Sequence, residues 1–91
     1  MYRIEAARSR VKRELRRIAE ADRVRIVDEI TALRMQPRPD RVAQLAPNVY
    51  RIRVGDYRVI YKVFDEQELI LIGRIARRDE GTYRGVGSLF D

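Results

Sequence analysis

The sequence contains no cysteine and no histidine, and only two of its basic residues are lysine. The absence of cysteine excludes disulfides and thiol nucleophiles, and the absence of histidine excludes imidazole acid–base chemistry and the usual zinc sites. No run of about 18 apolar residues and no signal-peptide pattern occurs, so neither a membrane partner nor secretion is indicated. We therefore expect a cytoplasmic protein.

What the chain does have is positive charge. Its net charge is +6, carried mainly by arginine, and 45% of its 91 residues are hydrophobic. This composition predicts one globular domain, residues 1–91, with an acidic or polyanionic partner, most often nucleic acid. The alternatives are that the charge only keeps the protein soluble, or that the arginine bias reflects a GC-rich genome. The placement of the arginines has to decide.

Two stretches, residues 7–18 and residues 22–35, carry apolar side chains at helical spacing. Asp22 is a plausible cap for the second helix, and Pro37 and Pro39 end it because proline lacks an amide donor. The two stretches predict a helical hairpin. Its apolar positions are Val11, Leu15 and Ile18 in the first helix and Val24, Val27, Ile30 and Leu33 in the second.

Three later segments, residues 49–54, 57–64 and 69–76, are rich in Val, Ile, Tyr and Leu. Gly55-Asp56 and residues 65–68 separate them, which predicts a three-stranded antiparallel meander. Residues 1–6 read either as a further short strand or as the start of the first helix. The expected fold is α+β, a helical hairpin on an antiparallel sheet, with residues 84–91 as a short tail.

A two-residue turn at Gly55-Asp56 fixes the register of the first two strands. It pairs Val54 with Tyr57, Arg53 with Arg58, and Arg51 with Ile60, and the next turn pairs Phe64 with Leu69. One sheet face is then almost wholly apolar and should cover the helices. It holds Tyr50, Ile52, Val54, Tyr57, Val59, Tyr61, Val63, Ile70 and Ile72, with Arg74 as an exception expected near an edge or reaching to solvent.

The other face gathers the cations Arg51, Arg53, Arg58, Lys62 and Arg77. Like charges directly opposed on a sheet destabilise it by a few tenths of a kcal/mol up to about 1 kcal/mol. An anion bound across the arginines would replace that repulsion with charge-assisted, bidentate contacts. The alternative is a merely solvated basic face.

The same face also carries an apolar half. It holds Ile60, Phe64, Leu69, Leu71 and Ile75, and the first four of these would form a large exposed patch if nothing covered them. Either Val86, Leu89 and Phe90 of the tail fold back over this patch, or a partner protein contributes a helix or strand to it.

After the helical hairpin and the proline break comes the segment "LAPNVYRIRVGDYRVIYKVFDEQELILIGRIARRDEGTY". This order of elements resembles the RelE/ParE superfamily of toxin–antitoxin toxins, and specifically its RelE branch. The resemblance covers residues 45–83 well, with "YRIRVGDYRVIYKV" as its strongest part.

The resemblance implies an endoribonuclease, without metal or cofactor, that cuts mRNA in the ribosomal A site by attack of a 2′-hydroxyl on the adjacent phosphate. By position, Arg51 and Arg53 would lie beside the attacking hydroxyl, and Arg58 would stabilise the phosphate. Arg77 would help the leaving 5′-oxygen, and Tyr83 would orient an mRNA base. We also expect Lys62 and Arg78 to contact RNA.

Two positions depart from the family pattern. Well-studied RelE enzymes have lysines where this chain has Arg51 and Arg53, and one of those lysines is a proposed general base. Arginine hardly releases its proton. Either the cationic cluster supplies most of the catalysis by stabilising charge on the phosphate, or the general base lies elsewhere. Tyr83, Asp79 and Glu80 are the candidates for that base.

The resemblance also implies partners. An acidic antitoxin, usually encoded in the adjacent gene, should mask the arginines and place an amphipathic segment on the apolar half, at Ile60, Phe64, Leu69 and Leu71. DNA would be bound only through the toxin–antitoxin complex. Two alternatives stay open: a ParE-like toxin that binds DNA gyrase, and a non-catalytic RNA- or partner-binding module of the same fold.

Overall fold

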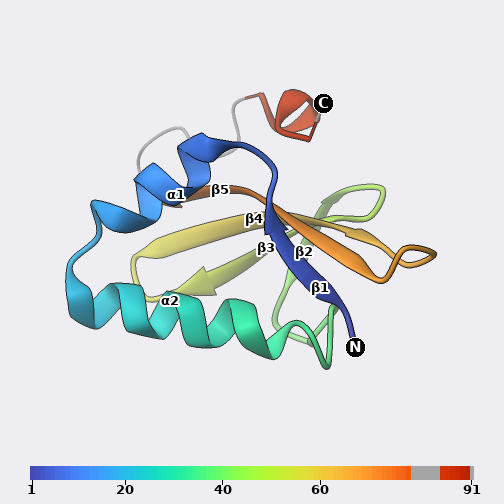
Figure 1. Cartoon of the computed structure of the whole chain (residues 1–91), viewed down its shortest axis with the longest axis horizontal. Helices are drawn as coiled ribbons and strands as arrows, with labels where there is room; N and C mark the ends of the chain where they lie inside the picture. The colour runs from blue at the N-terminus through green and yellow to red at the C-terminus, as the bar shows by residue number, and fades with distance from the viewer. Residues whose placement is uncertain (79–84, 91) are drawn as a thin grey trace.

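The computed structural model describes residues 1–78 and 85–90, in which two helices cover one face of a five-stranded sheet (Figure 1). The strand order is β1-β5-β4-β3-β2; β1 runs parallel to β5, and the other pairs are antiparallel. The sheet is therefore mixed. The elements are β1 (Arg3–Ala6), α1 (Ser9–Arg16), α2 (Glu20–Ala32), β2 (Ala43–Ala46), β3 (Val49–Val54), β4 (Tyr57–Phe64), β5 (Leu69–Arg77) and the 3-10 turn η1 (Val86–Ser88).

The helical hairpin and the three-stranded meander predicted from the sequence are confirmed, with shorter helices than expected. Asp22 does not cap α2: the cap position is Ala19, which makes no side-chain cap hydrogen bond, and Asp22 lies in the first turn. The N-terminal residues form a strand rather than a helix start. The strand β2 was not predicted.

The main core lies between the helices and the sheet. Ile26 of α2, Ile52 of β3, Tyr61 of β4 and Ile70 of β5 are completely buried there. The hydroxyl of Tyr61 donates a hydrogen bond of 2.7 Å to the carbonyl of Pro37. Burial of this ring raises the pKa of Tyr61.

A polar clamp fastens the loop after α2 to the turn between β4 and β5. Arg38 donates from Nη2 to Asp65 Oδ2 at 2.8 Å and from Nε to the Tyr50 hydroxyl at 2.7 Å. The hydroxyl of Tyr2 donates to Asp65 Oδ1 at 2.6 Å. The hydrogen bonds from Arg38 and then from Tyr2 lower the pKa of Asp65. Three segments distant in sequence thus meet at one carboxylate.

A β-bulge in β5 changes which side chains share a face. Tyr61 lies opposite Ile72, but its neighbour Ile60 lies opposite Arg74, so Gly73 is an extra residue in β5. The alternation of side chains therefore shifts by one position after Ile72. Arg74 joins the face away from the helices, whereas Ile75 packs in the main core. The sequence prediction had placed both on the opposite faces and is corrected here.

The C-terminal turn covers part of the face away from the helices; Figure 1 shows it in red, on the other side of the sheet from α2. Leu89 is buried against Val49 and Ile60, and Val86 and Phe90 pack beside them. The sequence predicted that either the tail or a partner protein covers this patch. The structure shows that the tail covers Ile60. An ideal Cβ on Gly73 would lie only 2.6 Å from Cζ of Phe90, so the absence of a side chain lets the ring approach β5.

Candidate functional site

The cations predicted on strands β3 and β4 do share one face, and the register aligns them in rows. Arg53 pairs with Arg58, and Arg58 pairs with Ala76. In the next row, Arg51 and Arg74 flank Ile60. Lys62 lies in the row beyond, between Val49 and Leu71. We call Arg51, Arg53, Arg58, Lys62 and Arg74 the arginine face.

Arg58 is the most unusual member because it is a buried cation. Its residue is 6% exposed, and its Nη1 donates to the carbonyls of Tyr57 at 2.9 Å and Gly55 at 3.3 Å. Gly55 has φ of 59°, so the tight turn that supplies these carbonyls uses a left-handed conformation that glycine favours. Within residues 1–78 and 85–90, Arg58 makes no ion pair with a carboxylate. A buried charge that is not neutralised attracts an anion.

The neighbours of Arg58 strengthen the positive potential. Arg53 lies directly opposite on β3 and is exposed. Neighbouring strands lie about 4.8 Å apart, so the backbones of these two arginines are close. Lys62 is partly buried, with its ammonium 5.2 Å from the centre of the Phe64 ring. The arginine face is therefore a fixed cationic surface on rigid strands.

Arg77 does not belong to this face, contrary to the sequence prediction. The bulge turns it toward the helices, and its guanidinium carbon lies 5.6 Å from the centre of the Tyr57 ring. Arg78 is exposed at the same end of the sheet, and its amide donates to the carbonyl of Asp56 at 3.1 Å. The candidates Tyr83, Asp79 and Glu80 lie outside the described residues.

Arg74 is the member of the arginine face that the sequence reading placed wrongly. Gly73 is the sequence feature that could have revealed its true position, since a glycine inside a strand often marks a bulge. The apolar residues around it satisfy either phase of the alternation, so the pattern alone gave no warning.

The predicted antitoxin-binding residues divide into two groups. Ile60 is fully buried beneath Leu89, whereas Phe64, Leu69 and Leu71 are partly exposed on the same face. Arg3 and Glu5 of β1 pair with Leu69 and Leu71 and form an ion pair of 3.5 Å with each other. The apolar surface still open on this face is therefore smaller than the sequence suggested.

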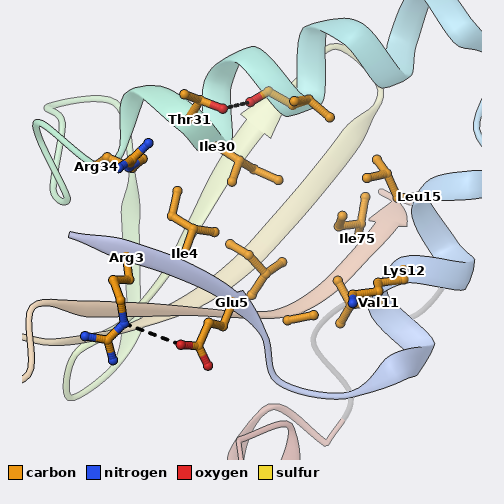
Figure 2. A pocket seen from close by; sticks show the side chains of 13 residues that line it. Arg3, Ile4, Glu5, Val11, Lys12, Leu15, Ile30, Thr31, Arg34 and Ile75 are labelled. Carbon is orange, nitrogen blue, oxygen red and sulfur yellow. Dashed lines mark hydrogen bonds and ion pairs between the residues drawn. The ribbon is translucent and has the colours of Figure 1, made fainter. Parts of the chain in front are cut away.

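On the opposite side, a groove of about 510 Å³ runs between α1, α2 and β1. Figure 2 shows apolar side chains such as Ile4, Leu15 and Ile30 inside it, with Lys12 and Arg34 toward its two ends. Val27 of α2 also lines the groove and is 41% exposed. The two helices thus leave part of their own apolar surface uncovered.

In the described part of the chain, no group of three or more Asp, Glu, His or Cys residues is arranged to hold a metal ion. No helix there is long and apolar enough to cross a membrane.

Comparison with known proteins gives consistent matches. Residues 5–81 match the family model of the ParE toxin of the type II toxin–antitoxin system parDE. A Methanocaldococcus jannaschii protein assigned as toxin RelE1 is 30% identical over 80 residues, which cover 82% of this chain and 88% of that protein.

Solved structures agree with these matches. The archaeal RelE–RelB complex from Pyrococcus horikoshii contains a chain that is 27% identical, with a TM-score of 0.74, covering 87% of this chain and 97% of that one. The isolated E. coli RelE toxin has the same fold at 21% identity, with a TM-score of 0.75 and coverages of 88% and 89%. The chain therefore belongs to the RelE/ParE superfamily of toxins from type II toxin–antitoxin systems.

Proposed function

We propose that this toxin cleaves mRNA in the A site of the ribosome and thereby inhibits translation. The buried guanidinium of Arg58 carries the proposal, because it lies directly opposite the exposed Arg53 and has no carboxylate partner among the described residues. Two such cations suit a phosphate better than any neutral ligand.

The chemistry would be an intramolecular displacement. The 2′-oxygen of one nucleotide attacks the adjacent phosphorus while the bond to the 5′-oxygen breaks, which leaves a 2′,3′-cyclic phosphate and a 5′-hydroxyl. The proton of the 2′-hydroxyl is released, and the 5′-oxygen takes up a proton. Arg58 would stabilise the negative charge that develops on the phosphate oxygens, and Arg51 and Arg53 would lie beside the attacking hydroxyl, where Arg53 is close enough to Arg58 to share in that stabilisation.

Dependence on the ribosome follows from what arginine can and cannot do. Guanidinium groups stabilise charge, but they keep their protons, and the rest of a flexible RNA strand must also be held in line for the attack. The ribosome would supply that alignment. We therefore expect the purified chain to cut naked RNA slowly, and rapid degradation of naked RNA would contradict the proposal.

The proposed protein partner is an antitoxin, which we expect to be acidic; the similar chain from Pyrococcus horikoshii is in a RelE–RelB complex. The apolar side chains of the antitoxin would cover Phe64, Leu69 and Leu71. The groove between the helices offers a second apolar surface, and Lys12 and Arg34 at its ends complement an acidic amphipathic helix. A second copy of this chain fits less well because its net charge is also +6.

The test compares two variants that each remove one exposed arginine. Arg53→Ala alters the arginine face, whereas Arg16→Ala alters α1 on the other side of the sheet. Each chain is induced in a bacterial host, and the 5′ ends of translated and untranslated messages are mapped. We expect cuts only in translated frames, reduced about a hundredfold by Arg53→Ala and unchanged by Arg16→Ala. Equal loss in both variants would show that only total charge matters.

A ParE-like toxin that binds DNA gyrase is the second candidate, and the description of the matching family model favours it. In that case growth would stop without mRNA cuts, and Arg53→Ala would arrest growth as well as the wild type. Purified gyrase would then lose supercoiling activity in the presence of the chain. Neither arrest nor cuts would leave a non-catalytic binding module.

A further inference from the structure

A pocket of about 330 Å³ lies on the helix side of the sheet, at the end where β4 begins and β5 ends. Its polar lining comes from Glu14 and the neighbouring Arg17, and from Tyr57 and Arg77 of the paired strands. Ile18 and Ile75 supply its apolar part. It is separate from the arginine face but adjoins it, because Tyr57 is the chain neighbour of Arg58.

The first feature of this pocket is a cation–π contact between a guanidinium group and an aromatic ring. Arg77 lies opposite Tyr57 in the register, and its guanidinium carbon is 5.6 Å from the centre of the Tyr57 ring. Arg77 faces this way only because Gly73 is an extra residue in β5. Unpaired RNA bases stack on aromatic rings and on guanidinium planes. The pocket therefore has a surface suited to one planar base.

The second feature is a fixed carboxylate. Glu14 Oε1 accepts a hydrogen bond of 3.0 Å from the amide of Ile75, and its side chain is 19% exposed. The other oxygen lies 3.8 Å from Nε of Arg10. A carboxylate has about four acceptor positions, so Glu14 retains capacity for a donor on a ligand. It is held by the strand and cannot easily turn away.

We propose that this pocket binds one unpaired base of the RNA strand whose phosphate lies on the arginine face, and that it prefers guanine. Guanine offers two adjacent N–H donors on its Watson–Crick edge, which match a carboxylate. Uracil offers one N–H between two carbonyl oxygens, which a carboxylate repels. The proposal rests on the proposed RNA cleavage, since it gives that reaction a preference for sequence at the cut.

The path of the strand is short. From Arg58 the RNA would pass round the end of β4, where Arg77 and Arg78 are both exposed. Ala76, which lies opposite Arg58 in the register, is a small side chain at the edge of the pocket. The phosphate would lie on one face of the sheet and its base on the other. Only the start of β4 and the end of β5 would separate them.

Binding can be tested without any cleavage. The ¹⁵N-labelled full chain is titrated with GMP, UMP and inorganic phosphate while the amide signals are followed by NMR. We expect GMP to shift the amides of Tyr57, Ile75 and Arg77 and to bind about fivefold or more tightly than UMP, which carries the same phosphate. Identical shifts from GMP, UMP and phosphate would mean that the pocket is only an anion site and would overturn the proposal.

Glu14→Gln is the matched variant, because the glutamine oxygen can still accept from the amide of Ile75. The preference for GMP over UMP should fall to about twofold or less, with the spectrum unchanged elsewhere. Arg53→Ala should instead weaken both nucleotides equally. A preference that survives Glu14→Gln would refute the assignment of Glu14.

The cellular cut map separates this proposal from the proposed function. If cuts depend on Arg53 but Glu14→Gln leaves the base distribution at the cuts unchanged, the cleavage proposal stands and the base pocket does not. If no cuts occur at all, the cleavage proposal fails, and the NMR titration still decides whether the pocket binds guanine.

Discussion

Replacing Gly73 with alanine probes the contact between the bulge and the C-terminal turn. The added Cβ would lie 2.6 Å from Cζ and 2.7 Å from Cε1 of Phe90, and 3.2 Å from Cβ of Leu89. Carbon atoms in ordinary contact are about 3.5–4.0 Å apart, so the phenyl ring would have to move by about 1 Å. Overpacking of this kind costs about 1–3 kcal/mol. We expect that loss in the free energy of unfolding.

The same substitution should cost much less once the ring is gone, because only the 3.2 Å contact with Cβ of Leu89 then has to relax. Gly73 does not have a positive φ, so alanine fits its backbone and restricts the unfolded chain by about 0.4–1 kcal/mol, which offsets part of the remaining cost. A double-mutant cycle tests this expectation. The free energy of unfolding in urea is measured for the wild type, Gly73→Ala, Phe90→Ala and the double variant. We expect a coupling energy above about 1 kcal/mol. Equal destabilisation by Gly73→Ala in both backgrounds would show that Phe90 does not lie on Gly73.

The remaining predictions concern stability. The Arg38 hydrogen bond holds the pKa of Asp65 below its usual value, so the stabilising contribution of this carboxylate is present above about pH 4 and lost as the pH falls through the folded-state pKa. Asp65→Asn should therefore have a lower midpoint of thermal unfolding than the wild type at pH 7, and the two midpoints should converge in acid. A difference between the midpoints that persists in acid contradicts this explanation. Tyr61→Phe removes the donor to the Pro37 carbonyl and should cost about 1–2 kcal/mol in urea unfolding. Because burial raises the pKa of Tyr61, wild type should also lose stability above about pH 10, a loss that Tyr61→Phe should reduce. Ile52→Ala empties a fully buried site and should cost about 2–5 kcal/mol; a smaller loss would mean that the core collapses around it.

The register of β3 and β4 was predictable because it depends on local chemistry. Gly55-Asp56 leaves two residues between two strongly β-forming segments, and such a turn fixes every pair that follows it. Strand β2 was missed because Ala43–Ala46 contains no β-branched or aromatic residue. It is an edge strand that pairs with β3 only, so its neighbour rather than its own composition holds it extended.

The candidate site was predictable as far as the register held. Arg51, Arg53 and Arg58 are on the expected face, whereas Arg74 and Arg77 exchanged places because of the bulge at Gly73. Isoleucines surround this glycine on both sides, so alternation could not locate the shift. The pocket at Glu14 could not be predicted from the sequence either. It depends on a contact between a helix and a strand that are 61 positions apart in the chain.

The position of β5 also determines when the molecule can form during synthesis. The first strand of the chain is bonded to the last one, with Arg3 paired to Leu69, and β5 lies between β1 and β4. Until β5 is made, β1 has no partner, β4 has an open edge, and Arg74 is absent from the arginine face. Such distant pairing forms late because the intervening chain must first be ordered. A nascent chain that stops before β5 therefore exposes apolar surface and sheet edges, which makes it prone to aggregate before it has the complete arginine face.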